Sequence, residues 1–429
     1  MLDLIVRQAN IFGKPVAQDI ACQSGRIVEV APRIEGQATR EIDAAGRLVT
    51  PPFVDSHFHM DATLSLLGQA RRNESGTLLE GIAMWGEFKP GQSAERIKER
   101  ALKLLRWSVA RGVLAVRTHV DICDPSLQAV QVLLEVREQM RPYLDMQLVA
   151  FPQDGYLRDP AAREQMKRAL DLGVDVVGGI PHFERTMAEG AESVRLLCEL
   201  AAERGLLVDM HCDESDDPMS RHVESLACQT TRLGLQGRVT GSHLTSMHSM
   251  DNYYVSKLLP LMAEARLNAV CNPLVNMVLQ GRHDSYPKRR GLTRVPELLA
   301  AGVNVSLGHD DILDPWYPLG SHDMLEVAHM GVHALHMSGA GQIEQLFEAV
   351  TSNAARTLQL EGYGLEPGCR ADLVVLQAAD PVEAIRLKAP RLEVVRAGRV
   401  IAQTPPVVSR VMLGGQESRV DFTLGSLGD

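Results

Sequence analysis

Short apolar runs typical of β-strands alternate with longer amphipathic segments through the middle of the chain. The apolar runs lie at 48–55, 113–119, 145–151, 174–180, 206–210, 238–242, 267–271 and 303–308. Helical spacing of apolar residues between them is plainest at 94–110, 127–140, 188–204 and 324–337. Strands that alternate with helices are typical of βαβ units around a parallel sheet, so this pattern predicts an α/β fold with a (β/α)8 TIM-like barrel.

The two ends of the chain have a different pattern from the middle. Residues 1–50 are predicted to form short strands separated by turns, and residues 361–429 contain an apolar run at 373–376 and a hairpin pattern with a turn at Gly398. We therefore expect one small β-sandwich domain, formed by 1–50 and 361–429 together. The barrel is expected to occupy 51–360.

The first barrel run leads into His57-Phe58-His59. On a strand, residues i and i+2 point to the same face, so His57 and His59 are expected to direct two imidazoles at one point. Two neutral imidazoles in this arrangement suit zinc or ferrous iron. Further ligands should then follow the later strands, because the active sites of such barrels lie at the carboxyl ends of the strands.

Polar side chains do follow every predicted barrel strand. They are His57, His59 and Asp61; Arg117, His119 and Asp121; Gln153 and Asp154; His182 and Glu184; His211, Asp213 and Glu214; Ser242, His243 and His248; Asn272 and Asn276; and His309, Asp310 and Asp311. Four of these have the residue types and positions of metal ligands, and we predict that they share one ion: His57, His59, His211 and Asp310.

A lone histidine on an apolar element is more often a structural residue than a ligand. We favour that interpretation for a second group of histidines: His182, His222, His283, His329 and His333. A lysine at the end of the fourth strand could, once carboxylated, bridge a second metal ion. Residues 173–182 contain no lysine, and Lys167 lies upstream on the preceding predicted helix. One divalent ion, Fe(II) or Zn(II), is therefore expected, because three imidazoles and a carboxylate accept either.

Three more side chains next to the predicted ligands suit proton transfer. A divalent metal lowers the pKa of bound water from ~15.7 towards ~7, and the reaction then needs a proton shuttle. Glu214 leaves the strand three residues after His211, where it can reach both the water and a substrate. Asp311, which follows Asp310, and His243, which ends the sixth strand, are predicted to orient and deprotonate the attacking water.

Several segments resemble the amidohydrolase superfamily and, within it, the bacterial cytosine deaminases. The resemblance extends over nearly the whole chain. It rests on the segments 53–61, 117–121, 151–155, 180–184, 211–214 and 308–311, and on the loops 272–276, 279–282, 286–291 and 314–320. The HxH pair is common to the superfamily, whereas the loops are far more specific.

This resemblance implies metal-dependent deamination of cytosine to uracil and ammonia, in pyrimidine salvage. It implies the same four ligands, and it assigns proton transfer to Glu214, His243 and Asp311. Water would add to C4 while Glu214 protonates N3. Gln153 would read the ring carbonyl and the adjacent N–H, and Leu78 and Trp316 would pack against the ring. The metal would be iron or zinc, and a homo-oligomer is expected.

Three alternatives stay open. The same site could deaminate 5-methylcytosine, isocytosine, creatinine or a triazine, because pocket packing decides which ring fits. It could instead hydrolyse a cyclic amide or remove an N-alkyl group, although Glu214 together with Gln153 favours deamination. The chain could also be an inactive metal-binding scaffold, which Glu214 and Asp311 beside the predicted ligands argue against.

Composition and charge limit the classes of partner and the compartment that we expect for this protein. A net charge of −10 and a pI near 5.8 argue against nucleic-acid binding, which requires a basic surface, and leave a small-molecule nucleobase as the expected substrate. No apolar run approaches the ~18 residues that span a membrane, and the N-terminus lacks a signal-peptide pattern. The odd number of cysteines, with no CxxC pair, favours a reducing compartment. We therefore expect a cytoplasmic protein with no nucleic-acid or membrane partner.

Overall fold

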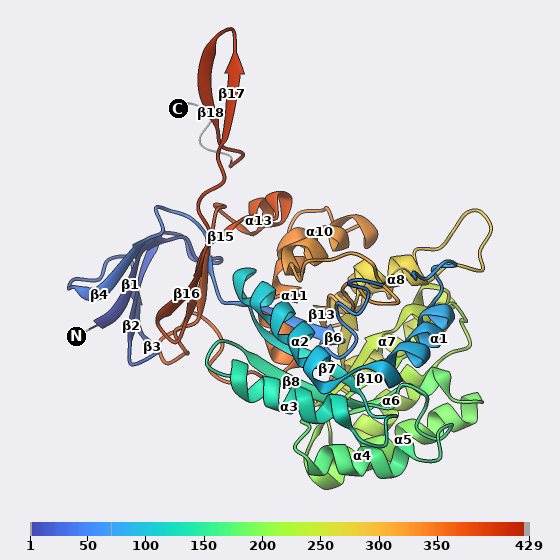
Figure 1. Ribbon diagram of the computed structural model, residues 1–429. Coiled ribbons are helices and arrows are strands. Elements are labelled where there is room, and N and C mark those ends of the chain that lie inside the picture. The colour runs from blue at the N-terminus through green and yellow to red at the C-terminus, as the bar shows by residue number, and fades with distance from the viewer. Residues whose placement is uncertain (1, 70, 424–429) are drawn as a thin grey trace.

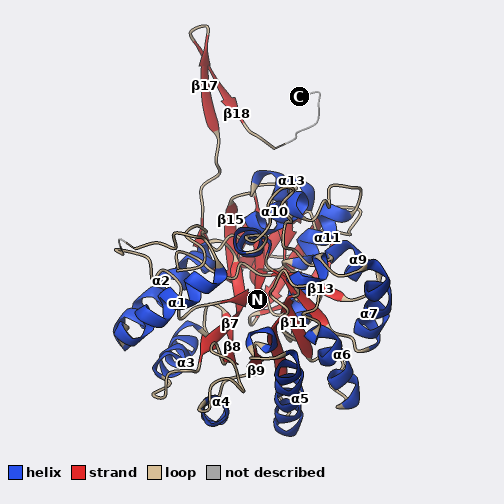
Figure 2. Cartoon of the chain, turned by 90° about the vertical axis from the view of Figure 1, so that its right-hand side faces the viewer, coloured by secondary structure: helices blue, strands red, loops and turns tan. Residues whose placement is uncertain are grey.

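The structure is a computed structural model that describes residues 2–69 and 71–423. An eight-stranded parallel sheet forms its centre, with the helices arranged around the strands (Figure 2). In spatial order, the strands are β13 (Asn304–Leu307), β12 (Asn268–Cys271), β11 (Val239–His243), β10 (Leu207–Cys212), β9 (Val176–Gly179), β8 (Asp145–Phe151), β7 (Val113–Asp121) and β6 (Phe53–Phe58). Spatial order follows chain order, so the predicted fold class is confirmed.

The barrel closes between its first and last strands. A parallel bridge joins Phe58 to Asp310. The backbone N–H of Asp310 donates to the carbonyl of His57 at 2.8 Å, and the N–H of His59 donates to the carbonyl of Asp310 at 3.0 Å. This junction, called here the β6–β13 seam, therefore runs through residues that the sequence predicts to bind metal.

Helices cover the outside of the barrel (Figures 1 and 2). They are α1 (Leu78–Phe88), α2 (Ala94–Ala110), α3 (Gln128–Met140), α4 (Ala162–Asp171), α5 (Met187–Arg204), α6 (His222–Arg232), α7 (Asn252–Glu264), α8 (Pro273–Leu279), α9 (Val295–Ala300), α10 (Met324–Ala334), α11 (Gln342–Ala349) and α12 (Ser352–Thr357), with 3-10 turns η1 (Lys89–Gly91), η2 (Pro181–Phe183) and η3 (Thr245–His248). The four helices predicted from spacing are all present. In α2, for example, Ser93 caps the first turn by accepting from the N–H of Arg96.

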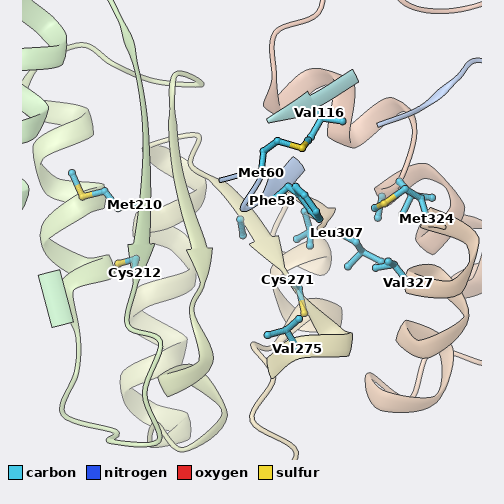
Figure 3. Packing of buried hydrophobic residues seen from close by; sticks show 14 of the residues in the cluster. Phe58, Met60, Val116, Met210, Cys212, Cys271, Val275, Leu307, Met324 and Val327 are labelled. Atoms are coloured by element: carbon cyan, nitrogen blue, oxygen red, sulfur yellow. The ribbon is translucent and has the colours of Figure 1, made fainter. Parts of the chain in front are cut away.

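Apolar side chains of strands and helices meet in one continuous core between the two layers. Phe58 of β6 and Leu307 of β13 lie toward Met324 and Val327 of α10 (Figure 3). Strands buried on both faces need apolar residues toward the helices, while the opposite face is free to carry polar groups. One such group is Arg117, which is fully buried and donates to Asp209 Oδ2 at 3.0 Å.

Both ends of the chain form small sheets beside the barrel, as predicted. One sheet has the order β3 (Arg26–Ala31), β2 (Gln18–Gln23), β1 (Leu2–Ala9), β4 (Ala38–Asp43), and the other β16 (Arg399–Gln403), β15 (Arg391–Arg396), β14 (Leu373–Leu376), β5 (Val49–Thr50). Helix α13 (Pro381–Leu387) follows β14. Met1 and residues 424–429 of the expected small domain lie outside the described residues.

The predicted run 48–55 proves to be two elements, which corrects the first strand. Its beginning is β5 of the small sheet, and its end is the start of β6 in the barrel. Pro51 and Pro52 separate the two, because proline lacks the N–H that a continuous strand would need for pairing.

A hairpin made of β17 (Ser409–Leu413) and β18 (Gln416–Val420) pairs within itself and projects away from the rest of the molecule (Figure 1). We call residues 409–420 the arm. Across residues 2–69 and 71–423, no helix combines the length and the apolar character that crossing a membrane requires.

Candidate active site

Four side chains from three barrel strands converge at the carboxyl end of the barrel. His57 lies in β6 and His59 just after it, His211 lies in β10, and Asp310 follows β13. The Nε2 atoms of His59 and His211 are 3.0 Å apart. Asp310 Oδ1 lies 3.4 Å from His57 Nε2 and 3.6 Å from His59 Nε2. The structure thus brings together all four residues predicted as ligands.

This donor set fits a divalent metal ion. Burial lowers the pKa of His57 and His211 well below the usual value and that of His59 to about 3, so all three imidazoles are neutral and can offer lone pairs. Both ring nitrogens of His57 are buried without a hydrogen-bond partner. Burying a polar atom without a hydrogen-bond partner costs free energy. A metal ion bound to these nitrogens would supply the missing partner. Three neutral imidazoles and one carboxylate suit zinc or ferrous iron.

His119 packs against the same cluster, although the sequence analysis gave it no role. Its ring centroid lies 4.1 Å from that of His57 and 4.5 Å from that of His211. Its Nε2 atom is 3.9 Å from Asp209 Oδ1. His119 comes two residues after Arg117 on β7 and so faces the barrel interior as Arg117 does. This two-residue spacing is the signal that could have identified it.

The three predicted proton-transfer groups face the cluster as well. His243 Nδ1 lies 3.5 Å from Glu214 Oε1 and 3.8 Å from Asp310 Oδ2. Burial raises the pKa of the Glu214 carboxyl to about 8, so this group holds a proton at neutral pH. Burial and the charges of Asp314 and Asp310 raise the pKa of Asp311 well above its usual value.

Neighbouring amides determine which nitrogen of His243 carries the proton. The Nδ2 atoms of Asn276 and Asn272 lie 3.0 Å and 3.3 Å from His243 Nδ1. With the amides in these orientations, their NH2 groups donate to Nδ1, which leaves the proton of the neutral ring on Nε2. His243 also has a backbone φ of +71°, and Asp310 one of +72°. Such left-handed conformations are costly for these residue types and are typical of functional sites.

The cluster opens into a cavity of about 490 Å³. The residues predicted to contact substrate, Gln153, Leu78 and Trp316, all line it. The Trp316 ring lies 6.4 Å from the ring of His59. Behind it, a Cβ on Gly81 of α1 would be 2.4 Å from Trp316 Cδ1. Only glycine at position 81 lets the indole occupy this wall without displacement.

The histidines interpreted as structural divide into two groups. The structure places His182 and His283 in the cavity wall, and both ring nitrogens of His182 are buried without partners, so a purely structural interpretation does not describe their position. His222, in contrast, binds Asp213 at 2.8 Å, and His329 and His333 lie side by side on α10 outside the cavity. The strand pattern placed His182 after β9 but gave it no role, whereas His283 lies on the loop after α8, which no strand pattern describes.

Comparison with known proteins agrees with this geometry. The profile of the amidohydrolase family matches residues 40–416. The crystal structure of 5-methylcytosine deaminase from Klebsiella pneumoniae liganded with phosphonocytosine is 43% identical, with a TM-score of 0.92 and coverage of 94% of this chain and 99% of that one. N-isopropylammelide isopropyl amidohydrolase of Pseudomonas sp. (strain ADP) is 30% identical over 95% of this chain and 99% of the relative. Pterin deaminase of Rhizobium rhizogenes is 29% identical, over 90% and 88%.

The family profile covers the barrel and the small sheet that contains β14–β16, and the 5-methylcytosine deaminase structure covers 94% of this chain. The matched region contains a buried cluster of three histidines and an aspartate that is suited to metal binding. The chain therefore belongs to the amidohydrolase family and is a hydrolase that acts on C–N bonds.

Proposed function

We propose that this protein deaminates cytosine or its 5-methyl derivative by hydrolysis at C4, and that it acts in pyrimidine salvage. The observation that carries the proposal is the placement of Glu214 and Gln153 in the wall of one cavity beside the predicted metal ligands. A protonated carboxyl group can supply the proton that the ring nitrogen needs, and an amide can match the neighbouring carbonyl and N–H. The similarity to a 5-methylcytosine deaminase supports the same class of ring.

One ion, Zn(II) or Fe(II), would be held by His57, His59, His211 and Asp310. When bound, it lowers the pKa of its water towards ~7 and so supplies a nucleophile at neutral pH. The proposal of a single ion is supported by β9, which has the sequence Val-Val-Gly-Gly and is followed by Ile180, with no lysine that could bridge two ions.

Proton transfers follow from the geometry of the three remaining polar groups. Asp311 Oδ1 is buried without a partner. The positive charge of a bound ion would favour the ionised form of Asp311 and so offset the effects that raise its pKa in the ion-free site, and the carboxylate would then accept the proton of the attacking water. His243, which the two asparagines hold at Nδ1, would orient that water. Glu214 gives its proton to N3 as the oxygen adds to C4. Asp311 then returns its proton to the amine, ammonia leaves, and the new hydroxyl proton restores Glu214.

The amide of Gln153 is expected to control ring recognition. Gln153→Leu keeps the size of the side chain but leaves the ring carbonyl and N–H without partners in a closed pocket. Leaving such groups unpaired costs about 1–3 kcal/mol, so kcat/KM for cytosine should fall roughly ten- to hundredfold. Steady-state kinetics measure this, with the exposed Gln131→Leu as the matched control. Unchanged kcat/KM in Gln153→Leu would show that the Gln153 amide does not recognise the ring.

The substrate assignment is tested by ammonia release from protein loaded separately with zinc and with ferrous iron. The panel contains cytosine, 5-methylcytosine, isocytosine and creatinine. We expect the first two to exceed the others, because apolar residues such as Leu78, Ile82 and Leu279 line the cavity and can accept a ring methyl group. Preferred release from creatinine or isocytosine would overturn the assignment.

We also propose that the protein self-associates through the arm. Met412 and Leu413 are each 72% exposed there, and an isolated two-stranded hairpin is only marginally stable in water. Light scattering coupled to size exclusion should give a mass that is a multiple of the 47.0 kDa chain, and Met412→Asp combined with Leu413→Asp should shift it towards the monomer. Phe12→Asp, at another exposed apolar residue, is the control. A monomeric wild-type protein would refute this proposal.

A further inference from the structure

A line of hydrogen bonds connects helix α2 to the β6–β13 seam through His322. Ser108 Oγ lies 2.6 Å from His322 Nδ1, and His322 Nε2 lies 2.8 Å from Asp55 Oδ2. The other carboxylate oxygen, Asp55 Oδ1, accepts the backbone N–H of His57 at 3.1 Å and that of His309 at 3.0 Å. Ser108, His322 and Asp55 are all fully buried. A side chain from outside the barrel thus reaches the backbone on both sides of the seam.

The order serine, histidine, carboxylate is that of a nucleophilic triad, but the surroundings argue against nucleophilic catalysis. Ser108 Oγ is bonded to the carbonyl of Leu104 at 3.0 Å as well as to His322. Among the described residues that line the active-site cavity, Ser108, His322 and Asp55 do not occur. A nucleophile must reach its substrate, so these three residues must act on the structure around them.

The position of Asp55 gives it control of the seam. Two backbone hydrogen bonds and one bridge join β6 to the chain after β13 at this point. Asp55 Oδ1 adds one hydrogen bond to each side of the seam, because it accepts the backbone N–H of His57 and that of His309. His57, His59 and Asp310, three of the four predicted ligands, are all attached to this short junction.

His322 itself is held firmly. Its backbone has a φ of +56°, an unusual conformation for histidine that the surrounding loop must enforce. The ring of Phe58 lies 4.7 Å from the imidazole at an angle of 30°, on the outer side of β6 where Phe58 faces α10 (Figure 3). The imidazole is therefore fixed by a ring contact and by hydrogen bonds at both nitrogens, and it can hold the Asp55 carboxylate in one orientation.

We propose that His322 is a positioning residue for the metal centre: by holding Asp55, it sets the spacing of β6 and β13 and with it the geometry of His57, His59 and Asp310. The inference rests on the proposed metal site and not on which ring is the substrate. Partners that orient ligands from behind typically change metal affinity by about 10–100-fold when removed.

Equilibrium competition with a fluorescent zinc chelator tests this role directly. His322→Ala should raise the apparent Kd for zinc by about 10–100-fold, and Ser108→Ala, which removes one hydroxyl, should raise it by less. Thr357→Val is the matched control, because Thr357 is a buried hydrogen-bonding residue that contacts Asn304 at the amino end of β13, away from the ligands. The control should lower the melting temperature without changing the Kd.

Cobalt(II) provides a second measurement that does not depend on activity. The visible absorption bands of the cobalt-loaded His322→Ala protein should shift relative to wild type, because the ligand geometry changes, while those of Thr357→Val should not. An unchanged Kd and spectrum in His322→Ala, or equal changes in Thr357→Val, would overturn the proposal. If His322→Ala does not fold, the same comparison is made with Ser108→Ala, and an unchanged Kd there would overturn it.

The proposed substrate and the positioning role of His322 can be refuted separately. Absence of ammonia release, with zinc binding intact and weakened in His322→Ala, would refute the substrate assignment and leave the positioning role standing. A wild-type chain that binds neither zinc nor cobalt would refute the metal site, and the role of His322 with it.

Discussion

Glu214→Gln should lower kcat for cytosine deamination by about 10²–10⁴-fold, the usual contribution of a positioned proton donor. Glutamine has the same shape and preserves the packing in the cavity wall, but its amide cannot exchange a proton with the ring nitrogen. The carboxyl group of Glu214 differs from this amide in being able to donate a proton at neutral pH, because burial raises its pKa to about 8.

The measurement is steady-state kinetics on zinc-loaded protein, with metal content determined for every sample. Glu203→Gln makes the same chemical change at an exposed position of α5 and should leave kcat unaltered. If Glu214→Gln retained full activity with full metal content, Glu214 would not be the proton shuttle, and another group would have to supply the proton.

His211→Ala should lose its metal and, with it, nearly all activity. Removal of a direct ligand is expected to exceed the about 10–100-fold loss that follows removal of a ligand's supporting partner. Dialysis against a chelator followed by elemental analysis should find metal in the wild type and little in the variant. His329→Ala, a histidine on α10 outside the cavity, should keep both metal and activity. Retention of metal and activity by His211→Ala would show that the ligand set is wrong.

The sequence predicted the barrel and the cluster for the same reason. Strand periodicity fixes which side chains share a face, and the carboxyl ends of parallel strands meet at one end of a barrel. His57, His59 and His211 could therefore be placed near one another before any coordinates. Strand periodicity alone does not place the side chain of Asp310, because this residue lies beyond the end of β13 in a left-handed conformation.

Contacts between loops and helices far apart in the chain could not be predicted in this way. His322 and Asp55 are 267 residues apart, and their contact depends on how the segment after β13 folds back over β6. The entry of His182 and His283 into the cavity wall likewise depends on the course of loops. An apolar run does not reveal that its two halves join different sheets, so β5 and β6 were predicted as one strand.

In the proposed reaction, water replaces the exocyclic amine while the ring stays closed. This can be tested by converting cytosine with the zinc-loaded protein in ¹⁸O-enriched water and analysing the products by mass spectrometry and ammonia determination. We expect uracil with one labelled oxygen and an equal amount of ammonia. An open-chain product, or loss of cytosine without ammonia, would contradict it and favour the ring-hydrolysing alternative.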